Sequence, residues 1–323
     1  MDTQALHPLE IKEIIEKAER ISIFTHDFPD GDAVGSVVAM YLLCKHLNKK
    51  AKVFFSGLNA ELWSFVPELS AICCDSVEDT ANNFLAIVVD SSNPQRLGKN
   101  EKYLKLASTI INIDHHPDNS NFGDINTVNS TCCSVGEIIF YLLADMGITL
   151  NQEMARVLLI SIITDTGRFK YSNVKPDIFR IIATLIEISG VEIYLEIVRK
   201  LYAENSIFKQ RLVAEAIKNI DFIKPNIAFS YIALDCGLED GLIDPILSIK
   251  GVEVAVLARI HSDILKLSFR AKNKEINVKD LAARFGGGGH INASGASIKL
   301  SKFKNQIKEI RDTIANYFLI NDN

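Results

Sequence analysis

Short apolar runs that each end in a polar loop form the pattern of the first half of the chain. Runs rich in β-branched and aromatic residues predict buried strands at 21–25, 51–55 and 85–89, with a fourth ending at Asp114. Longer segments carry apolar residues at helical spacing, at 8–20, 33–47, 134–146 and 152–163. Strands that alternate with helices predict a mostly parallel sheet with flanking helices and right-handed crossovers.

The second half of the chain has a different pattern. Residues 176–210 have helical periodicity throughout and contain no strand candidate. Beyond them the sequence predicts strand pairs at 221–223 with 227–234 and at 252–260 with 264–270, and short helices at 242–249 and 278–285. We therefore expect an α/β domain at 1–190, a helical connector at 191–210 and a smaller α+β domain at 211–323. The length of 323 residues also favours more than one domain.

Composition and charge narrow the class of substrate. The chain is 48% hydrophobic and 23% charged, an ordinary profile for a globular protein, and its formal net charge is −5. Proteins that follow long nucleic acids usually present a basic face, so this charge argues against long duplex nucleic acid as a partner. It favours a small or short anionic substrate whose negative charge is neutralised at the site by metal and a few cationic groups.

Cysteine usage and the N-terminal segment point to a cytoplasmic protein without a membrane anchor. The six cysteines include the adjacent pairs Cys73-Cys74 and Cys132-Cys133, but no CxxC spacing that would suggest zinc, so we expect small buried residues in a reducing compartment. The N-terminal segment lacks the basic and apolar regions of a signal peptide, and no apolar run approaches the ~20 residues that span a bilayer.

Side chains able to hold a metal follow the ends of four apolar runs. They are His26, Asp30 and Asp32; Asp90; Asp114, His115 and His116; and Asp165. Each group has an ordinary alternative, since Asp32 can be a helix N-cap and Asp-His-His a solvated turn. Four such groups at the ends of buried elements favour one site instead, because parallel sheets place their chemistry at the carboxyl edge of the strands.

A run of four glycines, Gly286 to Gly289, precedes His290 in the second half of the chain. Such a run is too flexible to lie inside a helix or strand, so we expect it to serve a purpose. Gly287, Gly288 and Gly289 can bring backbone N–H groups close to an anion, with His290 beside them and Arg270 upstream. The alternative is a disordered loop, and the small residues that continue to Gly295 favour the anion site.

These motifs together resemble a DHH phosphoesterase with a C-terminal DHHA1 domain. They are HxxPDGDAxGS from His26, the strand-end Asp90, DHH from Asp114, TDTGRF around Asp165 and GGGGHxxASG from Gly286. The chain is most similar to the bacterial nanoRNase and pAp phosphatase group, and the resemblance covers nearly all of it. It departs at Phe28, where a basic residue is common, and at Ala271, where a serine is common.

The resemblance implies a DHH catalytic domain that holds two metal ions and a DHHA1 domain that binds substrate. One ion would be held by His26, Asp30 and Asp90, and the other by Asp32, Asp90, His115 and Asp165, so that Asp90 bridges them. A mixture of carboxylates and imidazoles suits Mn²⁺ better than Ca²⁺, with Mg²⁺ as the alternative ion. Two such ions activate water for attack on phosphorus.

The remaining site residues are expected to handle the substrate. His116 would contact the phosphate and protonate the leaving oxygen, and Asp114 would fix an imidazole tautomer. Arg168 is either a substrate contact or part of a surface salt bridge. The resemblance also implies that the substrate is bound by Arg270, Gly287, Gly288, Gly289 and His290.

The expected activity is hydrolysis of very short oligoribonucleotides to mononucleotides and dephosphorylation of 3′-phosphoadenosine 5′-phosphate. The alternative is a soluble hydrolase of cyclic di-AMP or linear di-adenylate, which needs the same core. An inorganic pyrophosphatase would not need the GGGGH motif, and a metal-free nucleotide-binding module would have lost metal ligands. The expected partners are short RNA oligonucleotides or small nucleotides, with a second copy of the chain as a further candidate.

Overall fold

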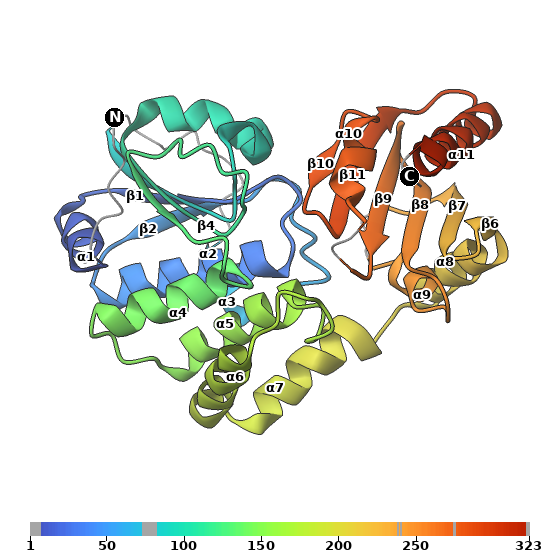
Figure 1. Ribbon diagram of the computed structural model, residues 1–323. Coiled ribbons are helices and arrows are strands. Elements are labelled where there is room, and N and C mark those ends of the chain that lie inside the picture. Colours follow the sequence, from blue (N-terminus) through green and yellow to red (C-terminus); the bar gives the residue numbers. More distant parts are fainter. Residues whose placement is uncertain (1–7, 73–82, 238, 240, 274–275, 321–323) are drawn as a thin grey trace. The chain divides into compact units, whose positions relative to one another are not determined.

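The computed structural model describes residues 8–72, 83–237, 239, 241–273 and 276–320. The chain divides into two compact units between residues 203 and 204, called here the first and the second unit (Figure 1). The segment 191–210 contributes to both. Helix α7 (Val191–Val198) and the π-helical turn η2 (Arg199–Ala203) belong to the first unit, and α8 (Ile207–Lys218) to the second.

The first unit is built on a five-stranded sheet in the order β2-β1-β3-β4-β5, with every pair parallel. The strands are β1 (Ile21–Phe24), β2 (Ala51–Phe54), β3 (Phe84–Val89), β4 (Ala107–Asp114) and β5 (Ile125–Val128). The expected parallel sheet is therefore confirmed. Strand β5 was not expected, because its four residues are too few to show periodicity and only pairing with β4 defines it.

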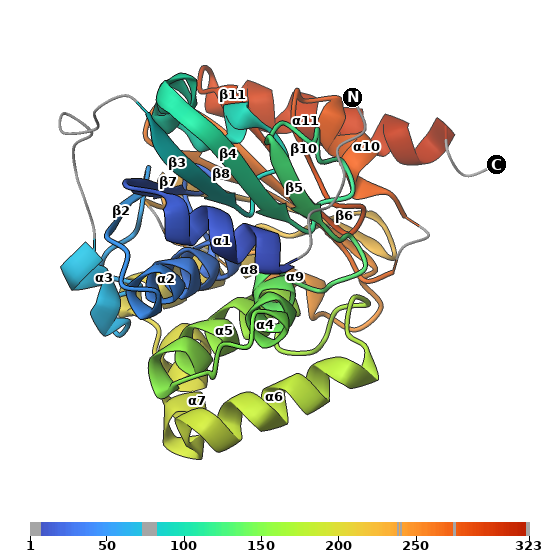
Figure 2. The same cartoon turned by 90° about the vertical axis from the view of Figure 1, so that its left-hand side faces the viewer.

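Helices cover both faces of this sheet (Figure 2). They are α1 (Pro8–Lys17), α2 (Gly31–His46), α3 (Pro67–Ile72), the 3₁₀ segment η1 (Pro94–Leu106), α4 (Val135–Asp145), α5 (Gln152–Asp165) and α6 (Pro176–Ser189). Side chains that alternate along each strand point to opposite faces of the sheet and pack into two different hydrophobic cores. Ile23, Ile87 and Ile111 pack with α2, α4 and α5, whereas Phe24 and Val88 face η1.

The second unit contains a six-stranded sheet in the order β10-β11-β9-β8-β7-β6. The strands are β6 (Asp221–Lys224), β7 (Ile227–Asp235), β8 (Val254–His261), β9 (Ile264–Ala271), β10 (Gly288–Gly289) and β11 (Ala293–Lys299). The helices are α8, α9 (Asp244–Leu247), α10 (Val278–Ala283) and α11 (Phe303–Ile320). Only β7 and β8 pair in parallel, because the connection that carries α9 crosses over between them. The expected smaller α+β domain is confirmed.

The glycine run Gly286 to Gly289 differs in structure from the prediction. Gly288 and Gly289 form β10, which pairs antiparallel with β11, so the expectation that the run lies outside any element is wrong. The reason is close approach of the two strands. A Cβ on Gly287 would lie 2.1 Å from the carbonyl oxygen of Gly295, so only glycine fits there.

The structure describes four of the six cysteines and the helices in which a membrane span was sought. Cys44, Cys132, Cys133 and Cys236 are buried free thiols, while Cys73 and Cys74 lie outside the described residues. Burial raises the pKa of the Cys44 thiol to about 12. Among the helices of the described ranges, none combines the length and apolar composition needed to cross a membrane.

Candidate metal centre

Six histidine and aspartate side chains of the first unit lie where its parallel strands end or at an end of one of its helices. His26 follows β1, Asp90 follows β3 and His115 follows β4, while Asp32 lies in the first turn of α2. These four side chains are buried. Asp165 is the last residue of α5, whereas the sequence placed it just beyond the helix. Asp30 is the most exposed member, with 55% of its side chain accessible.

His115 lies at nearly equal distances from three carboxylates. Its Nε2 is 3.6 Å from Asp32 Oδ2, 3.7 Å from Asp90 Oδ1 and 3.6 Å from Asp165 Oδ2. These separations exceed the ~2.7–3.2 Å of a hydrogen bond. They match the separation of roughly 3–3.6 Å between neighbouring ligand atoms that each bind one cation at about 2.1–2.2 Å. The four side chains are therefore spaced as ligands of a shared cation.

His26 forms a second group with Asp30 and Asp90. Its Nδ1 lies 2.9 Å from the carbonyl oxygen of Asp27, which can only accept, so Nδ1 carries a proton and, in the neutral ring, Nε2 offers its lone pair. Nε2 is 3.4 Å from Asp90 Oδ2 and 3.9 Å from Asp30 Oδ1. Asp90 thus faces His26 with Oδ2 and His115 with Oδ1, the arrangement of a bridging carboxylate.

Two buried atoms of these groups make no hydrogen bond with the described residues. They are His26 Nε2 and Asp90 Oδ1. An unsatisfied buried polar atom is costly, and a cation in each of the two groups would satisfy one of these atoms. The ligand atoms of His26, Asp30 and Asp90 lie within 4.8 Å of one another, as do those of Asp32, Asp90 and His115. The residues present therefore fit two divalent cations.

The charges of the cluster perturb its own ionisation. Burial disfavours the imidazolium form of His26, but the carboxylates of Asp30 and Asp90 outweigh it and raise its pKa to about 10. The pKa of His115 rises to about 9 because Asp165, Asp32 and Asp90 outweigh its burial. Burial itself raises the pKa of Asp165 to about 7, against the pull of His115. Buried carboxylates that compete for positive charge in this way are typical of a site built for cations.

Asp32 is held by a hydrogen-bond network rather than serving as a helix cap. Asp30 is the N-cap of α2 and accepts from the backbone N–H of Ala33, so the alternative role of N-cap for Asp32 is wrong. Asp32 Oδ1 accepts from the Ser161 hydroxyl at 2.6 Å, and Oδ2 accepts from the backbone N–H of Val135 at 2.8 Å, at the start of α4. Sequence reasoning missed Ser161, whose only local signal is its place four residues before Asp165.

His116 is oriented on both sides by charged partners. Its Nδ1 lies 2.7 Å from Asp114 Oδ1, and its Nε2 lies 2.8 Å from Nη1 of Arg96. A guanidinium can only donate, so Nε2 accepts and Nδ1 donates to Asp114. Asp114 Oδ2 accepts in turn from Asn119 Nδ2 at 2.6 Å. Sequence reasoning missed Arg96 and Asn119, and the only signal was that each follows a strand-end acid in its own loop.

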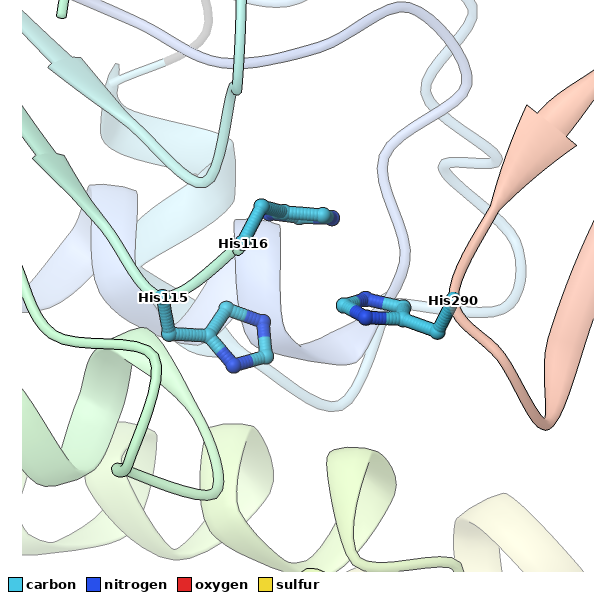
Figure 3. A group of neighbouring side chains, drawn as sticks. All are labelled: His115, His116 and His290. Atoms are coloured by element: carbon cyan, nitrogen blue, oxygen red, sulfur yellow. The ribbon is translucent and has the colours of Figure 1, made fainter. Parts of the chain in front are cut away.

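The two adjacent histidines turn to different faces of the sheet. Their rings are 4.9 Å apart and inclined at 66°. Figure 3 shows them leaving the end of β4 in different directions; the picture also draws His290 of the second unit. His115 meets the carboxylates of α2 and α5, and His116 meets Arg96 of η1. The alternation of side chains along an extended chain explains this division.

Arg168 lies in a turn directly after Asp165. Gly167, Arg168 and Phe169 have φ values of +54°, +60° and +62°, an unusual run of left-handed residues. The guanidinium carbon of Arg168 lies 4.4 Å from the centroid of the Tyr202 ring, a cation–π contact within the first unit.

The predicted substrate residues of the second unit lie on β9, on β10 and in the segments beside β10, and β11 separates the two strands in the sheet. Arg270 in β9 is the register partner of Ala293 in β11, and its Nη1 donates to the carbonyl oxygen of Phe269 at 3.0 Å. His290 begins the tight turn between β10 and β11, and its backbone N–H donates to the carbonyl oxygen of Ala293 at 2.8 Å. Gly287, Gly288 and Gly289 precede it.

Comparison with known proteins identifies the family. The model of the DHH family N-terminal domain matches residues 20–162, and that of the DHHA1 domain matches residues 226–318. A bifunctional oligoribonuclease and PAP phosphatase NrnA of Mycoplasma genitalium is 30% identical over 89% of this chain and 91% of that protein. The chain belongs to the DHH family. The resemblance expected from the motifs is thereby confirmed.

Two further DHH-family comparisons cover nearly the whole chain. The protein named bifunctional oligoribonuclease and PAP phosphatase NrnA of Thermus thermophilus is 28% identical over 90% of this chain and 87% of its own. The crystal structure of an exopolyphosphatase-related protein from Bacteroides fragilis superposes with a TM-score of 0.85 and 25% identity, over 97% of this chain and 96% of that one. Both the first and the second unit are therefore shared with these proteins.

Proposed function

We propose that this DHH-family protein is a Mn²⁺-dependent phosphoesterase that removes mononucleotides from very short oligoribonucleotides and dephosphorylates 3′-phosphoadenosine 5′-phosphate. The general class is that of a phosphoester hydrolase. The observation that carries the proposal is the placement of His115 Nε2 at 3.6–3.7 Å from three carboxylates, beside a second group that shares Asp90.

The substrate class follows from the relatives and from the charge. Relatives at 28% and 30% identity, matched along most of both chains, are named oligoribonuclease and PAP phosphatase. A protein with a net charge of −5 has no strong electrostatic attraction to the phosphates of long nucleic acid. Short substrates present few phosphates, so the negatively charged protein repels them less.

The ligand set favours Mn²⁺ or Mg²⁺ over softer ions. It contains carboxylates and imidazoles, while the described cysteines lie outside both groups. His26, Asp30 and Asp90 would hold one ion, and Asp32, Asp90, His115 and Asp165 the other. Two bound ions lower the pKa of a water molecule and neutralise charge on the phosphoryl group.

The chain's own residues then position the phosphate and handle a proton. Asp114 fixes the His116 ring, so that Nε2 is the atom presented to the site. Arg96 donates to that same Nε2 and brings a positive charge beside it. An arginine can exchange this contact for phosphoryl oxygens, which would free His116 Nε2 to take up a proton from water and then deliver that proton to the leaving oxygen.

A substrate panel assayed with Mn²⁺ tests the proposal. It contains diribonucleotides, a 24-residue RNA, 3′-phosphoadenosine 5′-phosphate, cyclic di-AMP, linear di-adenylate and pyrophosphate. We expect the highest kcat/KM for diribonucleotides and the bisphosphate, and no turnover after metal removal by a chelator. Preference for cyclic di-AMP would favour the alternative hydrolase, and turnover of pyrophosphate alone would overturn the phosphoester assignment.

A further inference from the structure

Phe28 is an exposed aromatic residue inside the candidate metal-binding loop. It lies between β1 and α2, two residues after His26 and two before Asp30. Large apolar side chains next to a polar centre are usually buried, yet 47% of Phe28 is accessible. Exposed aromatic residues elsewhere in the described ranges, such as Phe179 in α6 and Phe222 in β6, lie on helix or strand surfaces where exposure is ordinary.

The backbone of Phe28 has an unfavourable conformation. Its φ is +53°, in the left-handed region that a bulky side chain rarely adopts. Such a conformation persists only where the surroundings impose it. Here the N–H of Phe28 donates to the carbonyl oxygen of Ser56 at 2.8 Å, and the N–H of Asp27 donates to that of Arg96 at 2.6 Å. The loop is therefore fixed to the segment that follows β2 and to η1.

The ring of Phe28 rests on the backbone of Gly57. A Cβ on Gly57 would lie 2.7–3.1 Å from three carbons of that ring, so the ring is in direct contact with the glycine. Gly57 itself has a φ of +72°. This packing supports the ring from one side while nearly half of the residue stays accessible. A rigid aromatic surface that is partly accessible is the construction of a stacking platform.

We propose that Phe28 stacks on a nucleobase of the substrate whose phosphate lies at the metal centre. The inference rests on the proposed function and specifies it further, since it requires a substrate that carries a base. A nucleobase is one sugar away from its phosphate, so a platform within the metal-binding loop is suitably placed to meet it. Stacking on an aromatic ring accepts every base, because each base has a π-face. We therefore expect affinity for bases with little discrimination among them.

Three substitutions separate stacking from a role in shaping the loop. Phe28→Trp keeps an aromatic surface, Phe28→Leu keeps apolar bulk without a π-system, and Phe28→Ala removes both. Phe222→Ala in the second unit is the matched control, because Phe222 is 48% accessible and lies in a strand that contributes no predicted site residue. Thermal melting and Mn²⁺ titration of each protein report whether the fold and the metal groups are intact.

The assay compares a diribonucleotide with analogues in which one or the other base is replaced by an abasic ribose. Stacking is equally present in the bound substrate and the transition state, so its loss should raise KM and leave kcat nearly unchanged. We expect Phe28→Ala and Phe28→Leu to lower kcat/KM for the diribonucleotide by about 5- to 150-fold, the equivalent of about 1–3 kcal/mol. Phe28→Trp should retain activity, and Phe222→Ala should match the unmodified protein.

The abasic analogues decide the inference. One of them should be hydrolysed equally well by the unmodified protein and by Phe28→Ala, and it identifies the stacked base. The stacking role is overturned if Phe28→Leu retains full activity, or if Phe28→Ala affects both analogues as strongly as the diribonucleotide. A chain that hydrolyses no phosphoester at all would instead contradict the proposed function, which keeps the two failures distinct.

Discussion

At the scale of single residues, the site depends on which partners each side chain meets. His115 and His116 are neighbours in sequence, yet one is surrounded by three carboxylates at 3.6–3.7 Å and the other is held between Asp114 and Arg96. The separations around His115 suit a cation, and those around His116 are ordinary hydrogen bonds. Two residues of one type thus meet different sets of partners.

The first prediction separates these two histidines. His115→Ala should lose Mn²⁺, because it removes the imidazole around which the three carboxylates are spaced. His116→Ala should bind Mn²⁺ normally and turn over ~10²–10⁴-fold more slowly, the range for loss of a general acid. Calorimetric titration of Mn²⁺ together with kcat measures both effects. His46→Ala, at the exposed far end of α2, is the control. Equal metal loss in both site variants would show that the roles are divided wrongly.

The second prediction concerns Arg96, whose side chain reaches His116 while its backbone holds the loop of Asp27. Arg96→Ala should lower kcat/KM ~10- to 100-fold, as expected for a lost hydrogen bond to a charged group. Arg96→Lys should recover part of this loss because it restores the charge but not the fork of donors. Mn²⁺ affinity should be unchanged in both, since the backbone contact remains. Full activity of Arg96→Ala would exclude the side chain from phosphate binding.

At the scale of elements, glycines allow backbones to approach one another. The β10–β11 hairpin needs Gly287 because a Cβ there would lie 2.1 Å from a carbonyl oxygen, whereas a Cβ on Gly288 would meet nothing within 4 Å. In the first unit, a Cβ on Gly136 would lie 2.0 Å from the hydroxyl of Ser161, which holds Asp32. Close packing of α4 on α5 and the geometry of the metal centre therefore depend on the same contact.

The third prediction compares alanine substitutions at two neighbouring positions of the glycine run, one of which serves as the control. Gly287→Ala should destabilise the second unit by ~1–3 kcal/mol, because the added methyl group forces β10 and β11 apart. Gly288→Ala should change the free energy of unfolding by less than ~0.5 kcal/mol. Denaturant unfolding of both variants measures the difference. If Gly288→Ala is stable but raises KM for the substrate, Gly288 lies at the anion-binding surface, and an unchanged KM would argue against that role.

At the scale of the whole molecule, the metal groups and the glycine motif belong to different compact units. Every side chain in the two candidate ligand groups lies in the first unit, while Arg270 and His290 lie in the second. The first unit can therefore carry the metal chemistry, and the second unit is free to differ in what it recognises. The Thermus thermophilus relative, which is matched over 90% of this chain, is named bifunctional oligoribonuclease and PAP phosphatase.

The fourth prediction follows from this division. Arg270→Ala or His290→Ala should leave Mn²⁺ affinity unchanged and lower kcat/KM for diribonucleotides ~10- to 100-fold. Bis-p-nitrophenyl phosphate, which lacks the rest of a nucleotide, should be affected far less. A parallel fall for both substrates would mean that the second unit supports the fold and does not recognise substrate. Lys304→Ala, at an exposed position of α11, serves as the charge-loss control.

The sequence by itself determined most of the strands and helices and the types of residue at the strand ends. It did so because these signals are local: a continuous apolar run marks β3, helical spacing marks α5, and Asp90 follows directly after the run of β3. The parallel order of the sheet then brings such residues to one edge. The motifs were enough to name the family.

Only the tertiary structure decided how the side chains are oriented. Ser161 lies 129 residues from the Asp32 carboxylate it contacts, and Arg96 lies 20 residues from His116. Strand β5 and the hairpin of Gly288 and Gly289 exist through pairing with distant segments. Hydrogen-bond partners and close backbone approaches depend on which segments the packed core brings together, and that information is not contained in any local pattern.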